Sequence, residues 1–168
     1  MVPGIMFLLP LYLMFIKIQE TLGIRLINTY QGVIIVYSAF FIPFSIWILR
    51  GFFASIPVEL EEAAIIDGCS RIGAFVRVVL PLARVGIIAT GIYIFLMAWD
   101  ELLFAWALTT STEVATIPVG IRLYVGNYQN RYDLLMAAGC VTTLPVLVIF
   151  FGLQKYFITG MTAGAVKG

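Results

Sequence analysis

Few residues in this chain could do chemistry, and the acidic ones gather in one short stretch. Residues 59–67 hold four of the nine acidic side chains: Glu59, Glu61, Glu62 and Asp67. Carboxylates make strong, charge-assisted hydrogen bonds with basic groups, so this stretch is suited to binding a basic partner. Histidine, the commonest general base at neutral pH, is absent from the sequence. The pattern therefore favours binding over acid–base chemistry.

The two cysteines and the glycines suggest no further chemistry. Cys69 lies in a polar segment and Cys140 in an apolar one, without the spacing of a metal site or a disulfide framework. The G-x-x-x-x-G-K-[ST] loop that cradles nucleotide phosphates is also missing. We therefore expect a protein without catalytic residues, metal site or cofactor.

The elements that position these residues are membrane helices. The chain is 62% hydrophobic and 11% charged, whereas ordinary soluble domains carry about 25% charged residues. Its net charge of +1 gives no basic footprint for nucleic acid. A spanning helix needs about 20 mostly apolar residues. The sequence predicts an all-α membrane protein with four spans, at about residues 2–18, 30–49, 85–108 and 134–157.

The positive charges predict an orientation. Six Lys and Arg residues lie in the segment 50–84 and the C-terminal tail, against four on the opposite side. Because cytoplasmic loops are enriched in these residues, we expect the segment and the C-terminus in the cytoplasm, and the protein in the plasma membrane. Met1 opens directly into an apolar run, without the basic start of a signal peptide. We expect that helices upstream of it are missing from this chain.

The segment at about residues 55–82 predicts a helix–turn–helix. Ser55 is a candidate cap for the first helix, and Pro57 is tolerated in a first turn. Gly68 is the natural left-handed stop of that helix. Ser70 is a candidate cap for the second helix, which we expect Pro81 to end.

The second helix has an apolar face. Ile72, Phe75, Val76 and Val79 recur at helical spacing. This face alone is compatible with a hairpin that lies on the membrane surface. That alternative does not explain the acids, small residues and glycine turn of the first helix.

The spacing of this segment resembles a known motif. Glu62-Ala63-Ala64, three residues, Gly68, nine residues, Val78, one residue and Leu80-Pro81 is similar to the EAA loop of ABC-importer permeases. The family prefers Ile where Val78 stands. In that family the loop docks on a cytoplasmic ATP-binding subunit and transmits its closure to the membrane helices. The resemblance implies an ATPase-coupling set of Glu62, Ala63, Ala64, Asp67, Gly68, Leu80 and Pro81.

Three stretches resemble the carbohydrate branch of this family, the maltose-type second permease. They are P-V-E-L-E at residues 57–61, Asp67-Gly68 within the loop, and the tail G-M-T-A-G-A-V-K-G at residues 160–168. The resemblance implies four partners: an ATP-binding subunit that hydrolyses the ATP, a second permease subunit, an extracytoplasmic solute-binding protein and membrane lipid. It runs along one transmembrane domain, residues 1–168, but covers only the C-terminal part of the family's pattern.

Polar residues inside the spans are candidates for the translocation path. Asp100 and Glu101 follow Trp99 after a long apolar run, with Asp100 roughly 22 Å along the helix from Val85. Acids at such a depth usually face a cavity or a partner. The family commonly has Asn where Asp100 stands. We expect Trp99, Asp100 and Glu101 to line the path, or the acids to reach the outer interface instead.

Thr142 and Thr143 interrupt the last span close to Pro145. They are candidates for contact with the solute. The alternative is that their hydroxyls repair the backbone hydrogen bonding that the proline breaks.

These features together predict the permease subunit of an ATP-driven carbohydrate importer, which works by alternating access. A first alternative keeps the fold and changes the cargo to an amino acid, phosphate or a polyol phosphate. A second is a membrane-integral enzyme, against which the missing histidine and acid–base cluster argue. A third is a channel, whose polar pore-lining repeats we do not find.

Overall fold

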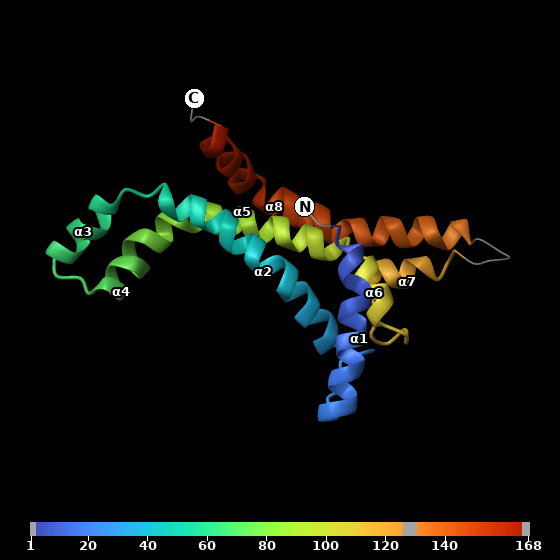
Figure 1. The fold of residues 1–168 in the computed structure, drawn as a ribbon. Coiled ribbons are helices and arrows are strands. Elements are labelled where there is room, and N and C mark those ends of the chain that lie inside the picture. Colours follow the sequence, from blue (N-terminus) through green and yellow to red (C-terminus); the bar gives the residue numbers. More distant parts are fainter. Residues whose placement is uncertain (1–2, 126–130, 166–168) are drawn as a thin grey trace. The chain divides into compact units, whose positions relative to one another are not determined.

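The fold is all-helical in the part of the chain that the computed structural model describes, residues 3–125 and 131–165, with side chains described up to residue 154. The prediction of an all-α fold is confirmed (Figure 1). The elements are α1 (Ile5–Leu22), α2 (Tyr30–Ala54), α3 (Val58–Ile66), α4 (Arg71–Ala74), the π-helical turn η1 (Phe75–Val79), α5 (Leu80–Trp99), α6 (Leu103–Leu108), α7 (Ile117–Arg122) and α8 (Tyr132–Ala165). Of the tail motif, residues 166–168 lie outside the described residues.

Four stretches are long and apolar enough to cross a membrane, as the sequence predicts. They are Ile5–Leu22, Tyr30–Ala54, Arg71–Trp99 and Tyr132–Gln154. The predicted bounds of the third, residues 85–108, are wrong. The helix begins at Arg71 and ends at Trp99, and residues 103–108 form the separate helix α6. The break occurs because Glu101 supplies hydrogen bonds to the first turn of α6.

Pro81 does not end the second helix of the loop, contrary to the prediction. The helix continues through α4, η1 and α5 without interruption. In η1 the N–H of Leu80 bonds to the carbonyl of Phe75, five residues back. A proline inside an α-helix lacks a donor and crowds the carbonyl four residues before it. The wider π turn directly ahead of Pro81 relieves this crowding, so the helix continues.

The described chain divides into two units, and we describe each by itself. Among the described residues, unit 1 comprises 3–40, 96–125 and 131–145, and unit 2 comprises 41–95 and 146–165. The buried core of unit 1 is apolar and comes from α1, α2, α6 and the link between α1 and α2: Phe15, Leu26, Val33, Val36, Phe104 and Leu108. This core joins α6 to the two N-terminal helices.

Asn28 ties the two connecting loops of unit 1 together. It has a left-handed backbone, with φ of 57°, which Asn tolerates better than most residues. Its side-chain oxygen accepts the N–H groups of Thr110 and Ser111, both at 2.9 Å. Its own N–H donates to the carbonyl of Leu108 at 2.7 Å. The start of α2 is thereby fixed to the end of α6.

Gly32 allows the chain to turn tightly into α2. Thr29 Oγ1 donates to the Leu26 carbonyl at 2.8 Å and accepts the N–H of Gly32 at 3.2 Å. A Cβ atom at position 32 would overlap the backbone carbonyl of Leu26. Because that obstacle is backbone, a larger residue displaces the turn.

In unit 2, the second half of α2 runs antiparallel to η1 and α5, and α3 and α4 form a hairpin beyond them (Figure 1). The face of α5 that is buried carries the small residues Ala83, Gly86 and Thr90. Small side chains permit close approach of helices in membranes. We use "hairpin" below for residues 58–74.

The turn at Gly32 gives a prediction of stability. Gly32→Ala is expected to destabilise the protein by about 1–3 kcal/mol, the usual range for overpacking. The apparent Tm in detergent then falls by roughly 2–12 °C. The matched control is Gly51→Ala in the same helix, where a Cβ meets nothing within 4 Å. Equal Tm values for the two variants would contradict the account of this turn.

Candidate functional site

The turn of the hairpin is built around Gly68. This residue has φ of +91°, a conformation that side-chain-bearing residues rarely adopt. The N–H of Gly68 bonds to the carbonyl of Ile65 at 3.0 Å, and the N–H of Cys69 bonds to that of Ala64 at 3.0 Å. Together these bonds form a Schellman motif that satisfies the last carbonyls of α3. The predicted left-handed stop at Gly68 is confirmed.

The caps of the two hairpin helices are partly as predicted. Ser70 caps α4, since its hydroxyl oxygen accepts the N–H of Gly73 at 3.1 Å. The prediction for Ser55 is wrong, because its hydroxyl donates to the carbonyl of Phe52 at 2.7 Å and so closes the end of α2. Pro57 takes the cap position of α3, without a side-chain bond.

The inner face of the hairpin is lined by alanine. Ala64 is 9% exposed and Ala74 is 0% exposed, and α3 packs against α4 and η1. A larger residue at either position would force these helices apart. Hairpin packing therefore accounts for the second alanine of the E-A-A triplet, whose side chain is turned inward.

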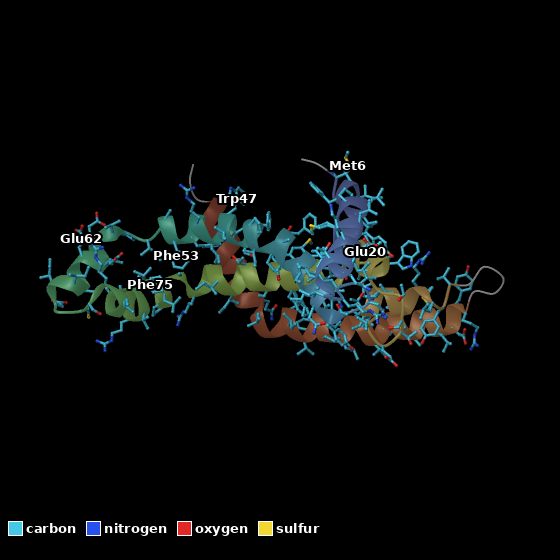
Figure 2. The ribbon with its side chains drawn as sticks, turned by 60° about the horizontal axis from the view of Figure 1, so that its bottom comes forward. Met6, Glu20, Trp47, Phe53, Glu62 and Phe75 are labelled. Carbon is cyan, nitrogen blue, oxygen red and sulfur yellow. The ribbon has the colours of Figure 1, made fainter. Side chains whose placement is uncertain are left out.

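The outer face of the hairpin carries the other predicted coupling residues. Glu62, Ala63, Asp67 and Gly68 are exposed, and Figure 2 shows Glu62 on α3. Within the described residues, the carboxylates of Glu62 and Asp67 make no hydrogen bond or ion pair. They are available to an external partner.

Two exposed isoleucines were missed as site residues by the sequence analysis. Ile66, beside Asp67, is 84% exposed, and Ile72 is 78% exposed. The periodicity placed Ile72 on an apolar face, but this face is not buried within the hairpin. The sequence does carry a signal for Ile66, because a large apolar residue between the alanines and the turn is unusual in a polar segment.

Leu80 and Pro81, the last two residues of the predicted coupling set, are exposed at the start of α5. They follow η1 and so lie beyond the hairpin in the chain. The structure thus divides the predicted set into an exposed group on the hairpin, the buried Ala64, and a pair on the membrane helix.

Glu101 is held in the break between α5 and α6. Its Oε1 accepts the N–H of Phe104 at 2.9 Å, and its Oε2 accepts the N–H of Ala105 at 3.0 Å. The hydroxyl of Tyr37, on α2, also donates to Oε2 at 2.8 Å. The carboxylate caps α6, where the helix dipole favours an anion. The sequence predicted that Glu101 lines the path or reaches the outer interface, and it did not predict this capping.

Asp100, by contrast, is exposed at the end of α5, directly after Trp99. Its N–H bonds to the carbonyl of Leu96 at 3.1 Å, which closes the last turn of the helix. The two neighbouring acids therefore differ: Glu101 is committed to α6 and Tyr37, and Asp100 projects from the helix end.

The hydroxyls of Thr142 and Thr143 both donate to the carbonyl of Gly139, at 3.1 and 2.8 Å. The carbonyl that Pro145 deprives of a donor is that of Val141, four residues before it. The threonines thus bond to the backbone but do not repair that particular gap. Among the described residues they share no hydrogen bond with Asp100 or Glu101.

The chemistry of the hairpin is limited by the groups that it exposes. Among the described residues, no three Cys, Asp or Glu side chains come together in a group that could hold a metal ion. Its exposed groups are carboxylates, isoleucines and backbone at the turn, which suit contact with another macromolecule.

Comparison of the sequence with known proteins identifies the family of this chain. Residues 1–163 match the family described as "Binding-protein-dependent transport system inner membrane component". The chain is 39% identical to the trehalose/maltose transport system permease protein of Thermococcus litoralis, over 90% of this chain and 54% of that one. It is 35% identical to the arabinooligosaccharides transport system permease protein of Halalkalibacterium halodurans, over 100% and 57%.

The diacetylchitobiose uptake system permease protein of Streptomyces coelicolor is 37% identical, over 85% of this chain and 52% of that one. The chain spans about half the length of these curated relatives. The resemblance seen in the sequence is confirmed, as is the expected class of a non-catalytic transport component. This chain belongs to the family of multi-pass inner-membrane permeases of binding-protein-dependent ABC importers.

Proposed function

We propose that this chain is the permease subunit of an ATP-driven carbohydrate importer, and that its hairpin is the contact with the ATP-binding subunit. The observation that carries the proposal is the Schellman turn at Gly68, which holds an exposed, unpaired acidic face on a packed helical hairpin. The names of the relatives support a carbohydrate as the transported solute, because they include transport of trehalose, maltose and arabinooligosaccharides.

The exposed side chains of the hairpin fit a docking surface. Ile66 and Ile72 leave apolar area in water, and covering such area is favourable by about 25 cal/mol per Å². Glu62 and Asp67 add carboxylates that make charge-assisted bonds with a basic cleft. A partner with an apolar floor and basic walls matches both features.

Positive charge supports a cytoplasmic hairpin. Four exposed arginines lie in the hairpin or near it in the sequence: Arg50, Arg71, Arg77 and Arg84. Their position agrees with the enrichment of basic residues in cytoplasmic segments. The opposite side then faces an extracytoplasmic solute-binding protein. A second permease subunit and lipid complete the surroundings of the spans.

The mechanism we propose is alternating access. ATP closes the ATPase dimer, the hairpin moves with it, and the spans rock to open the path outward. The hairpin suits this role because it has no free internal joint: its turn is fixed by two backbone bonds and its inner face is packed.

For the translocation path we propose Asp100 and Trp99, at the end of α5, as lining residues, together with Thr142 and Thr143. Glu101 holds the break that ends α5, so it sets where Asp100 projects. The exposure of Asp100 supports a role in contact with water or solute.

The coupling role is tested at the turn. Gly68→Pro is expected to abolish solute-stimulated ATPase activity in the assembled transporter, because proline cannot adopt a positive φ. Ala64→Arg has the same expected result, since the guanidinium cannot fit between α3 and α4. Gly68→Asn is the matched control and retains coupling, because Asn tolerates the left-handed region.

Membrane levels of each variant are measured by quantitative immunoblot. Stimulation at the wild-type level in Gly68→Pro or Ala64→Arg would overturn the coupling role.

The path is tested at Asp100. Asp100→Asn is expected to change the rate or the solute selectivity of uptake by about tenfold, the scale of one charge-assisted hydrogen bond. Glu101→Gln serves as the comparison, with its main effect on thermal stability through α6. Uptake rate and selectivity that stay at wild-type values in Asp100→Asn rule out the lining role.

A further inference from the structure

The two arms that connect the hairpin to the membrane helices differ in stiffness. On one side, helix runs without interruption from Arg71 to Trp99. On the other side, α2 ends at Ala54 and residues 55–57 are not helical before α3 begins. A movement of the hairpin is therefore transmitted to α5 through continuous helix, whereas its path to α2 passes through a short non-helical link.

A close contact between α2 and α5 connects the two helices directly, beside the non-helical link. Gly86 is buried on α5, and the ring of Phe52 lies against it. A Cβ atom at position 86 would overlap Cβ, Cγ and Cδ1 of Phe52. Cβ and Cγ of Phe52 lie on the axis about which the ring rotates, so rotation of the ring does not move them away from position 86. The fit depends on the missing side chain.

The face around Gly86 is adapted to this approach. Ala83 and Thr90 lie one turn before and one turn after it and are also buried. Thr90 Oγ1 donates to the Gly86 carbonyl at 2.7 Å, so its hydroxyl is satisfied within α5. The face therefore presents small surfaces to α2 without a free polar group.

Two aromatic contacts flank the Phe52–Gly86 contact. Phe44 meets Tyr93 at 5.3 Å between ring centroids, and Phe53 stacks on Phe75 at 6.2 Å with an interplanar angle of 25°. Figure 2 shows Phe53 and Phe75 facing one another between their helices, on the hairpin side. Along α2 the contacts follow the order 44, 52, 53, and along the partner helix 93, 86, 75, as an antiparallel pair requires.

We propose that Phe52 and Gly86 are positioning residues for coupling: their contact makes α2 and α5 move as one body when the hairpin is displaced. This inference rests on the proposed function of the hairpin. It assigns to Gly86 a role that needs no contact with ATPase or solute. The Phe53–Phe75 stack holds α2 in the same way, closer to the hairpin.

The test compares two glycines of one helix in the assembled transporter. Gly86→Ala is expected to lower solute uptake per ATP hydrolysed by roughly fivefold or more, the effect of about 1 kcal/mol. Basal ATPase activity and membrane level remain at wild-type values. Gly91→Ala is the control, since a Cβ at Gly91 meets nothing within 4 Å, and it keeps the wild-type ratio. A wild-type ratio in Gly86→Ala overturns the proposal.

A double-mutant cycle tests the contact itself. Phe52→Ala removes the ring and is expected to lower the ratio as well, by loosening the joint. Gly86→Ala/Phe52→Ala is expected to be no worse than the poorer single variant, because Phe52→Ala removes the ring together with Cγ and Cδ1, the two atoms closest to the added Cβ. If the two substitutions lower the ratio of uptake to ATP hydrolysis by independent factors that multiply, the two residues do not act through one contact, and the proposal is contradicted. If Gly86→Ala does not accumulate in the membrane, Phe52→Ala decides alone, and its wild-type ratio overturns the proposal.

The Gly68→Pro variant separates this inference from the proposed function. Coupling retained in Gly68→Pro overturns the role of the hairpin. Coupling that is lost in Gly68→Pro but retained in both Gly86→Ala and Phe52→Ala overturns the role of the Phe52–Gly86 contact and leaves the role of the hairpin standing.

Discussion

The structure depends on one constraint: in apolar surroundings, backbone N–H and C=O groups must be satisfied within the protein. At three points where helical hydrogen bonding is broken, neighbouring groups compensate. The donor missing at Pro81 is accommodated by a π turn, and the first N–H groups of α6 bond to Glu101. In the hairpin, α3 lies outside the candidate spans, and its last carbonyls are likewise satisfied within the chain by the Schellman turn at Gly68. These remedies decide where helices stop, and so where the hairpin and the helix break lie.

The two connections of the hairpin to the membrane helices differ in secondary structure. Between the hairpin and α5 there is continuous helix, while residues 55–57 are not helical. In the proposed mechanism, α2 must be held at a point near this link: Phe53 contacts Phe75 of η1 beside it, and Phe44 contacts Tyr93 of α5 further along α2. The small-residue face of α5 is thus as important to the proposed mechanism as the charged face of the hairpin.

The sequence predicted the features that are set locally. The turn at Gly68 and the cap at Ser70 depend on residues within a few positions, so their types sufficed. The end of the third span was mispredicted although Glu101 bonds to N–H groups only three and four residues further on. Its carboxylate is also held by Tyr37, which is 64 positions away in the sequence, and that pairing is not visible in the spacing. Likewise, the inward orientation of Ala64 follows from packing against α4 and η1. Spacing alone could not separate that alanine from Ala63.

The π turn at residues 75–79 also sets the angular relation between the hairpin and the spanning helix. An α-helix advances about 100° per residue, and a π turn accommodates one residue more than an α turn does. Because η1 takes up its extra residue within a single turn, the hairpin faces the same direction around the axis of α5 as it would on an α-helix one residue shorter. Removal of a residue from the regular α-helix of α5 would instead rotate the acidic face by about 100°. A change in length is thus tolerated at η1 and not in the regular helix that follows it.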